Sequence, residues 1–272
     1  MDANTIAVLI LLGSFFVMIL MRVPIAYAVG LSTVFCLMYM GKPLTTIPQQ
    51  LVKGMWSFSL MAVPFFITMG CLMGSGGISE KLVALANSAV GWMRGGLAQV
   101  NVLLSMLMGG CSGSANADCA MQSKMLVPEM EKRGYSKAFS AAITAASSAA
   151  TPVIPPGVNL IVFTLIAQAS LGRTFAAGYV PGILMSVAMM ITTAIIAKKR
   201  NYPKTREKMP PAKVILKQGL ISFWGLFFPF GIILGMRFGL FTPSEGGAVA
   251  VLYCFIIGGL VYRKLNLKKH FI

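Results

Sequence analysis

The stretch GGCSGSANAD, from Gly109 to Asp118, decides how this sequence folds. It closes an uncharged run that begins at Gly95, at a depth where a membrane helix would carry leucine, isoleucine and phenylalanine. A second interruption, TPVIPPG, covers residues 151–157 inside another uncharged run. Lipid cannot satisfy the backbone groups that such breaks expose, so each break must be buried in protein or line a watery cavity. The pair predicts a site for a solute and an ion near the middle of a bilayer.

The composition places the chain among integral membrane proteins. It has 57% hydrophobic and 11% charged residues, whereas an average soluble domain has about 25% charged residues. Most of its uncharged runs reach the roughly 17 to 25 residues that a spanning helix needs. Several closely spaced runs predict an all-α polytopic membrane protein, because a lone anchor or signal peptide would leave the rest of the chain polar. The runs are 3–21, 23–41, 54–79, 95–117, 138–172, 174–197, 218–236 and 246–262.

The formal net charge of +16 does not indicate nucleic-acid binding, because the basic residues cluster in short connections between the runs. By the positive-inside rule, the most basic connection is cytoplasmic. If residues 95–130 enter the membrane and return on the same side, the other charges agree with this: the N-terminus lies outside and the C-terminal tail inside. The basic connection has Glu207 as its acidic residue and carries Lys198, Lys199, Arg200, Lys204, Arg206, Lys208, Lys213 and Lys217.

Residues 95–131 predict a re-entrant hairpin. An apolar limb, 95–108, and a more polar limb, 117–130, are each too short to span a membrane. The amides that begin the second limb favour an anion, and the carbonyls that end the first limb favour a cation. Asp118 either caps the second limb or belongs to the site, and both roles stay open. The turn between the limbs is expected at Ser112, Gly113, Ser114 and Asn116.

Residues 138–172 predict a broken helix. The three prolines of TPVIPPG remove amide donors and clash with preceding carbonyls, so the helix must stop near Ala150 and restart after Pro156. The carbonyls of 147–150 are expected to point into the break. With the neighbouring hydroxyls they suit a hard cation such as sodium, whereas the restarted half-helix offers amides to a carboxylate. These hydroxyls belong to Ser147, Ser148 and Thr151.

Other interpretations of the two breaks remain open. Small residues can serve close helix packing alone, which would make the chain a membrane scaffold, and prolines can simply kink a helix. Residues 110–113, GCSG, match the GxSG of intramembrane serine proteases, but that chemistry needs a general base. The one histidine, His270, lies beyond the last run, and Lys124 lies on the wrong part of the hairpin. The five cysteines follow no metal-ligand spacing and are interpreted as small apolar fillers.

The sequence resembles a known family of transporters. The segments GGCSGSANAD, LVPEMEKRGY, AAITAASSAATPVIPPG and GYVPGILM are similar to those of the large membrane subunit of tripartite ATP-independent periplasmic (TRAP) transporters, the DctM type. MRVPIAYAVG, VPFFITMG and FTPSEGGAVAVLY extend the resemblance over nearly the whole chain. It implies an elevator-type, sodium-coupled importer of organic acids in the bacterial inner membrane. A periplasmic solute-binding protein delivers the acid, and a small membrane subunit of the DctQ type completes the complex. The alternative within this class is an organic anion symporter that needs no binding protein.

The resemblance also implies roles for individual residues. Sodium is the only coupling ion expected, with no other cofactor. Asn116 stands where a small aliphatic residue is more common and Gly157 where a serine is common, which puts the identity of the substrate in doubt. The expected sodium ligands, mostly through backbone carbonyls, are Ser112, Ser114, Asp118, Ser147, Ser148 and Thr151. The expected substrate site consists of Ser112, Gly113, Ser114, Asn116, Pro155, Pro156, Gly157 and Asn159.

The last spans resemble the first two in opposite orientation, as an inverted repeat requires. The family's large subunit carries a second hairpin and a second broken helix, which this sequence lacks. The chain is therefore expected to be a fragment, a truncated reading frame or one half of a split subunit, and to be unable to transport alone. The expected division is into scaffold helices at 1–94, a transport element at 95–172, a span with its basic loop at 173–212, and the start of a second, incomplete repeat at 213–272.

Overall fold

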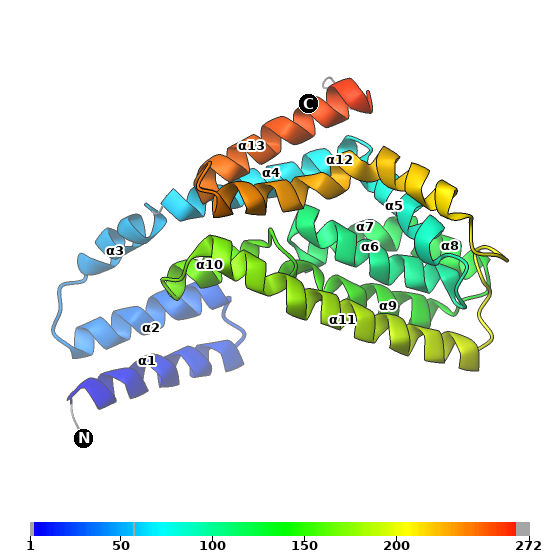
Figure 1. Ribbon diagram of the computed structural model, residues 1–272. Helices are drawn as coiled ribbons and strands as arrows, with labels where there is room; N and C mark the ends of the chain where they lie inside the picture. The colour runs from blue at the N-terminus through cyan, green and yellow to red at the C-terminus, as the bar shows by residue number, and fades with distance from the viewer. Residues whose placement is uncertain (1–2, 57, 265–272) are drawn as a thin grey trace. The chain divides into compact units, whose positions relative to one another are not determined.

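The computed structural model describes residues 3–56 and 58–264, with the backbone alone at 58–59, 110–112, 228–230, 233, 237 and 243. Every regular element in these residues is a helix, which confirms the predicted all-α class. The chain divides into two compact units, Met1–Ser57 and Phe58–Ile272. Figure 1 traces the helices of each unit in chain order.

The first unit consists of α1 (Ala3–Leu20), α2 (Ile25–Tyr39) and α3 (Thr46–Met55). The helices α1 and α2 pack against each other through small residues, since Ala7 and Ala28 are buried. Large apolar side chains such as Leu9 and Phe16 are exposed on α1. An apolar helix pair with so little buried surface is suited to lipid on its outer faces.

The second unit begins with a short 3₁₀ turn, η1 (Phe58–Met61), and two helices, α4 (Ala62–Ser75) and α5 (Ile78–Val90), which are bent by 69° to each other. At the bend Gly77 has φ of +78°, a left-handed conformation that glycine adopts at little cost. The last elements of the chain cover this pair: α12 (Ala212–Arg237) packs on α5, and α13 (Pro243–Ile256), continued by the π-helical turn Ile257–Val261, packs on α4. The core between them includes Phe66, Met69, Met73, Leu82, Ala250 and Cys254.

The hairpin and the broken helix occupy the middle of this unit. The hairpin consists of α6 (Gly96–Ser112), α7 (Ala115–Met125) and α8 (Val127–Lys132). The broken helix consists of α9 (Lys137–Ser148), the 3₁₀ turn η2 (Thr151–Val153) and α10 (Val158–Ile166), with a bend of 45° at the break. The predicted interruption by the prolines is confirmed. The long helix α11 (Leu171–Lys199) follows, and α6 packs against α5, α9 and α11.

Three helices of the described residues are long and apolar enough to cross a membrane, or five spans result if each bent pair counts as one. The three are Ala3–Leu20, Leu171–Lys199 and Ser244–Val261. The uncharged run 54–79 is not one continuous helix, because it is divided among α3, η1, α4 and the start of α5. Most of this run belongs to α4, which forms a bent pair with α5.

Candidate functional site

The hairpin turn is tighter than the sequence predicted. It consists of Gly113, with φ of +56°, and Ser114, whose hydroxyl accepts a hydrogen bond from the amide of Ala117 at 3.4 Å. Asn116 therefore lies in the first turn of α7 and not in the loop. Ser112 ends α6, and its side chain lies outside the described part of the structure.

The tip of the hairpin touches the break in the other helix. A Cβ placed on Gly113 would lie 2.8 Å from the carbonyl oxygen of Pro156 and 3.1 Å from the Cα of Gly157. Lower in the hairpin, a Cβ on Gly109 would lie 2.7 Å from the Cβ of Ile154. The backbones of Gly113 and Pro156, 156 − 113 = 43 positions apart in the sequence, thus approach each other closely.

A cavity of about 560 Å³ opens beside this contact. Four of the predicted substrate residues line it: Gly113, Ser114, Asn116 and Asn159. Pro155, Pro156 and Gly157 are buried behind the lining. The opposite wall, which sequence reasoning missed, is the face of α4 with Ile67, Gly70, Cys71 and Gly74.

The cavity also reaches Asp118, whose exposed fraction is 1%. Its Oδ2 accepts hydrogen bonds from Ser105 Oγ at 2.8 Å, Gln122 Nε2 at 2.9 Å and Thr151 Oγ1 at 2.9 Å. Its Oδ1 is buried and has no hydrogen-bond partner among the described residues. Because Ser114 provides the cap of α7, the capping role considered for Asp118 is not the one that its side chain performs. A buried carboxylate oxygen without a donor is costly unless a cation or a water satisfies it.

Ser147 and Ser148, the other predicted sodium ligands of the broken helix, do not line this cavity. Ser147 Oγ donates to Asn101 Oδ1 at 2.7 Å, and Ser148 Oγ donates to the carbonyl of Thr144 at 2.8 Å. Asn101 Nδ2 in turn donates to Thr144 Oγ1 at 2.9 Å. The bonds of Asn101 to Ser147 and Thr144 join α6 to α9, whereas the bond of Ser148 lies within α9. Neither serine lines the cavity.

The expectation of unpaired carbonyls at the break is wrong at two positions. The carbonyl of Ser147 accepts from the amide of Ala150 at 3.1 Å, and the carbonyl of Ala150 accepts from Val153 and Ile154 at 3.1 and 3.3 Å. The chain tightens into 3₁₀ geometry before the prolines, which is a common way to satisfy the end of a helix.

Polar residues in the apolar limb were the missed signal. Gln99, Asn101 and Ser105 are all fully buried in α6, and Gln99 Nε2 donates to the carbonyl of Met190 in α11 at 2.9 Å. Asn101 with Ser105, and Asp118 with Gln122, are spaced four residues apart, the spacing that places side chains on one face of a helix. That pattern could have identified the polar seam between the limbs.

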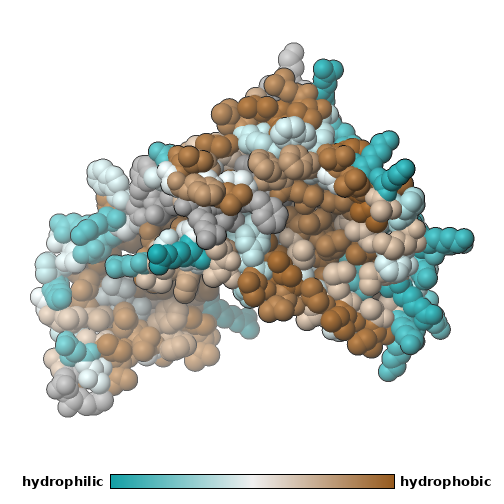
Figure 2. All heavy atoms as spheres, in the orientation of Figure 1, coloured by the Kyte–Doolittle hydropathy of each residue, from teal (hydrophilic) through white to brown (hydrophobic). Residues whose placement is uncertain are grey.

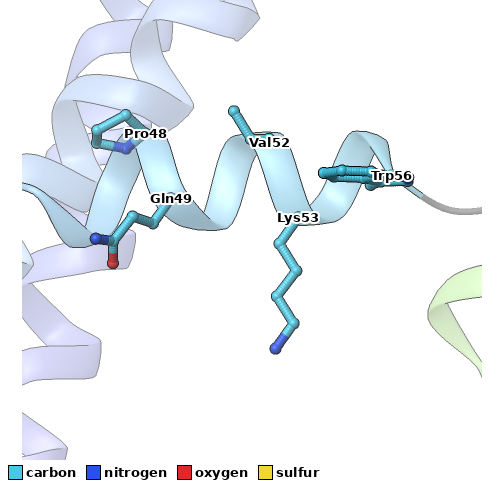
Figure 3. A pocket seen from close by; sticks show the side chains of 5 residues that line it. All are labelled: Pro48, Gln49, Val52, Lys53 and Trp56. Carbon is cyan, nitrogen blue, oxygen red and sulfur yellow. The ribbon is translucent and has the colours of Figure 1, made fainter.

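The first unit has a hollow of a different kind. Figure 3 shows its lining, Pro48, Gln49, Val52, Lys53 and Trp56, along the single helix α3 and its end. Trp56 is 86% exposed there. All five lining residues come from α3 and the residue that follows it, so among the described residues this hollow lacks the converging elements of a binding site.

The chain is similar to known transporter proteins. The family model described as "Tripartite ATP-independent periplasmic transporter, DctM component" matches residues 12–271. The 2,3-diketo-L-gulonate TRAP transporter large permease protein YiaN of Escherichia coli is 37% identical over 96% of this chain and 61% of its own length.

Two further relatives carry other substrates in their names. The C4-dicarboxylate TRAP transporter large permease protein DctM of Vibrio cholerae is 34% identical over 92% of this chain and 55% of its own length. The sialic acid TRAP transporter permease protein SiaT of Haemophilus influenzae is 37% identical over 92% of this chain and 40% of its own length. The chain thus spans 61% or less of these three relatives. They are transporter permeases and not enzymes, which excludes the protease interpretation of residues 110–113.

Proposed function

Because the chain belongs to the DctM component family of tripartite ATP-independent periplasmic transporters, we propose that it forms part of the large permease of a sodium-coupled importer of an organic acid. The acid is delivered by a periplasmic solute-binding protein, and a small membrane subunit completes the complex in the bacterial inner membrane. The observation that carries this proposal is the unpartnered Oδ1 of Asp118 beside the cavity at the hairpin tip.

The cavity offers an anion two helix N-termini. α7 begins at Ala115 and α10 begins at Val158, and both residues line the cavity. Gly157 gives α10 no side-chain cap, so its first amides are available to a carboxylate. Ser114, Asn116 and Asn159 supply polar side chains that orient the acid.

Asp118 explains why binding of the anionic solute would require a cation. Its negative charge stands next to the place where an anionic solute would bind, and in a medium of low dielectric two like charges repel strongly. Sodium bound at Oδ1, with oxygens of Ser112 and Ser114 as further ligands, removes this repulsion. Thr151 acts through Asp118 by holding Oδ2, and the binding of one solute then depends on the other.

The hairpin and the broken helix would move together as the elevator body. Buried side chains join them: Asn101 bridges to Thr144 and Ser147 of α9, and Thr151 of η2 bonds Asp118 of α7. Gln99 adds a bond from α6 to α11. The donors and acceptors of these bonds find their partners inside the protein. Separating the elements in the membrane would leave them without partners, which is energetically costly.

Uptake by the assembled permease that contains this chain tests the proposal. In vesicles with the binding protein outside, an inward sodium gradient should drive accumulation of the acid. Ser114→Leu and Asn116→Leu should abolish it, whereas Ser123→Leu, on an exposed position of α7 away from the cavity, should leave it intact. Intact uptake in the first two variants contradicts the site, and uptake without the binding protein supports the independent symporter instead.

The chain itself provides a second test, because the exposed Cys71 lines the cavity. In a variant whose only cysteine is Cys71, sodium should slow its reaction with a maleimide and potassium should not. The control is a variant whose only cysteine replaces Ser123. Equal labelling rates of Cys71 in sodium and potassium would remove the support for a cation site at Asp118.

A further inference from the structure

The loop between α11 and α12 forms a surface that transport does not explain. We define the basic rim as the eight exposed residues Lys198, Lys199, Arg200, Lys204, Arg206, Lys208, Lys213 and Lys217. The structure shows no ion pair for any of these eight described side chains. Lys132, Arg133 and Lys137 of the neighbouring α8–α9 connection, by contrast, pair with Glu129 or Glu131.

The rim is held in place rather than carried on a free loop. Tyr202 stacks on Tyr135 with ring centroids 4.4 Å apart, and the hydroxyl of Tyr135 donates to the carbonyl of Pro203 at 3.1 Å. Burial raises the pKa of Tyr135 to about 12, so this donor stays protonated at physiological pH. The amides of Thr205 and Arg206 both donate to the carbonyl of Gly91, at 2.9 and 3.0 Å. The loop is thereby fixed to the ends of α5 and α9.

The flanking helices place the rim at the edge of the apolar zone. Ile191 and Ile195 of α11 are 58% and 64% exposed, and the same face continues after one turn into Lys198 and Lys199. On α12, the exposed Leu216 and Leu220 share a face with Lys213 and Lys217. Figure 2 shows hydrophilic side chains gathered at the end of this unit, beyond the hydrophobic surface of its helices.

Lysines next to a lipid-facing stripe extend their charged ends to the headgroup level. Trp92, adjacent to Gly91 and half-buried, is of the residue type that marks the same level. The basic rim therefore combines unpaired positive charge, a fixed loop and a position where the apolar faces of two helices end. These features fit a partner whose anionic groups lie in a plane around the helices. We propose that the basic rim binds the phosphate groups of anionic phospholipids, and that this leaflet thereby holds the base of the hairpin and the broken helix.

The test measures lipid preference and stability of the full chain. In phosphatidylcholine vesicles that contain phosphatidylglycerol, the thermal unfolding temperature should be higher than in phosphatidylcholine alone, and native mass spectrometry should detect retained phosphatidylglycerol. The triple variant Lys198→Gln, Lys199→Gln, Arg206→Gln should lower the preference for phosphatidylglycerol by about tenfold or more. Raising the salt concentration should weaken the preference in the original chain.

The matched control also removes two lysines and one arginine, but from the α8–α9 connection, where these residues form ion pairs: Lys132→Gln, Arg133→Gln, Lys137→Gln. This control should keep the preference, and the charge-preserving variant Lys198→Arg, Lys199→Arg, Arg206→Lys should keep it as well. Equal loss in both Gln triples overturns the proposal. So does an equal stabilisation by inorganic phosphate, which would indicate a site for a soluble anion. If the first triple does not fold, the salt dependence of lipid retention by the original chain decides, and salt-insensitive retention overturns the proposal.

Discussion

At the scale of single residues, Thr151 connects the broken helix to the carboxylate of the hairpin. Its side chain is fully buried, and its hydroxyl donates to Oδ2 of Asp118 at 2.9 Å. Thr151→Val keeps the shape and removes the donor to a charged acceptor, so we expect a loss of about 1.5 to 3 kcal/mol of stability. Thermal unfolding in detergent measures this.

Thr151→Ser is the control for that substitution, because it keeps the hydroxyl and loses only a methyl group. It should retain most of the stability and the sodium response of Cys71. If the valine variant is as stable as the serine variant, the hydrogen bond to Asp118 contributes nothing and the link between the two breaks is one of packing alone.

Gly113 allows a test of the contact between the two breaks. Gly113→Ala places a side chain at a φ of +56°, which costs about 1 to 2 kcal/mol, and drives its Cβ to 2.8 Å from the carbonyl oxygen of Pro156. Gly134 also has a positive φ, +85°, but a Cβ there would meet nothing within 4 Å. Gly134→Ala therefore measures the backbone strain without the clash.

The alanine at 113 should lower the unfolding temperature more than the alanine at 134, and it alone should abolish the sodium protection of Cys71. Equal effects of the two substitutions would mean that the turn and the proline break do not need their close contact. Sequence alone indicated that both breaks are special, but it could not indicate that one glycine is the point at which they meet.

Asp118 shows where residue-level prediction stops. The sequence left its role open between a helix cap and a site residue, because both require an aspartate near the start of a helix. The distinction depends on Ser114 taking the cap and on Ser105, Gln122 and Thr151 reaching Oδ2 from α6, α7 and η2. Contacts between distant segments of this kind leave no local trace in the sequence beyond buried polar residues four positions apart.

At the scale of elements, α11 provides the surface against which the break is seated. A Cβ on Gly178 would lie 2.7 Å from the carbonyl oxygen of Val153, and one on Gly182 would lie 2.4 Å from Cγ1 of Ile154. Gly182→Ala should therefore overpack this contact and cost about 1 to 3 kcal/mol. Gly172→Ala, in the same helix with nothing within 4 Å, should be neutral or stabilise by up to about 1 kcal/mol.

Unfolding temperatures of the two variants decide the matter. If Gly182→Ala is no worse than Gly172→Ala, the close approach of α11 to η2 is not required for the fold. The motif GYVPGILM was recognisable in the sequence, but its packing partner was not, because glycine spacing indicates close approach without identifying the neighbour.

The broken helix was predicted more accurately than its hydrogen bonds. Proline sterics alone place the end of α9 and the start of α10 within a few residues. The hydrogen bonds that the Ser147 and Ala150 carbonyls accept from residues 150–154 could not be predicted, because the end of a helix can be satisfied by water, by a ligand or by a tighter turn. A sodium site built mainly on those carbonyls has weaker support than one built on Asp118.

At the scale of the whole molecule, charge-free runs predicted apolar segments better than they predicted helices. The runs 3–21 and 174–197 correspond to α1 and most of α11, whereas 54–79 falls across α3, η1, α4 and the start of α5. Hydropathy indicates whether a segment is more stable in lipid or in water. The continuity of a helix depends on other features, such as the glycine pair at 76–77, where α4 ends and α5 begins. The division at 1–94 and the proposed second repeat remain predictions.

The orientation of α11 in the membrane determines on which side the connections at its two ends lie. With 29 residues, α11 is about 43 Å long and exceeds a hydrocarbon core of about 30 Å. Arg173 is exposed near the first residue of α11, and the basic rim begins in its last turn with Lys198 and Lys199. We therefore expect Lys204 on the cytoplasmic side and Arg173 on the periplasmic side.

Single cysteines at these two positions, in a variant without other cysteines, test this expectation. A membrane-impermeant maleimide added to intact cells should label Arg173→Cys and leave Lys204→Cys unlabelled, and inside-out vesicles should give the opposite result. Labelling of both from one side would mean that α11 does not cross the bilayer. The reversed pattern would place the basic rim on the periplasmic side. The assignment of the cytoplasmic face from charge would then be wrong, and a periplasmic binding protein would approach the hairpin from the opposite end.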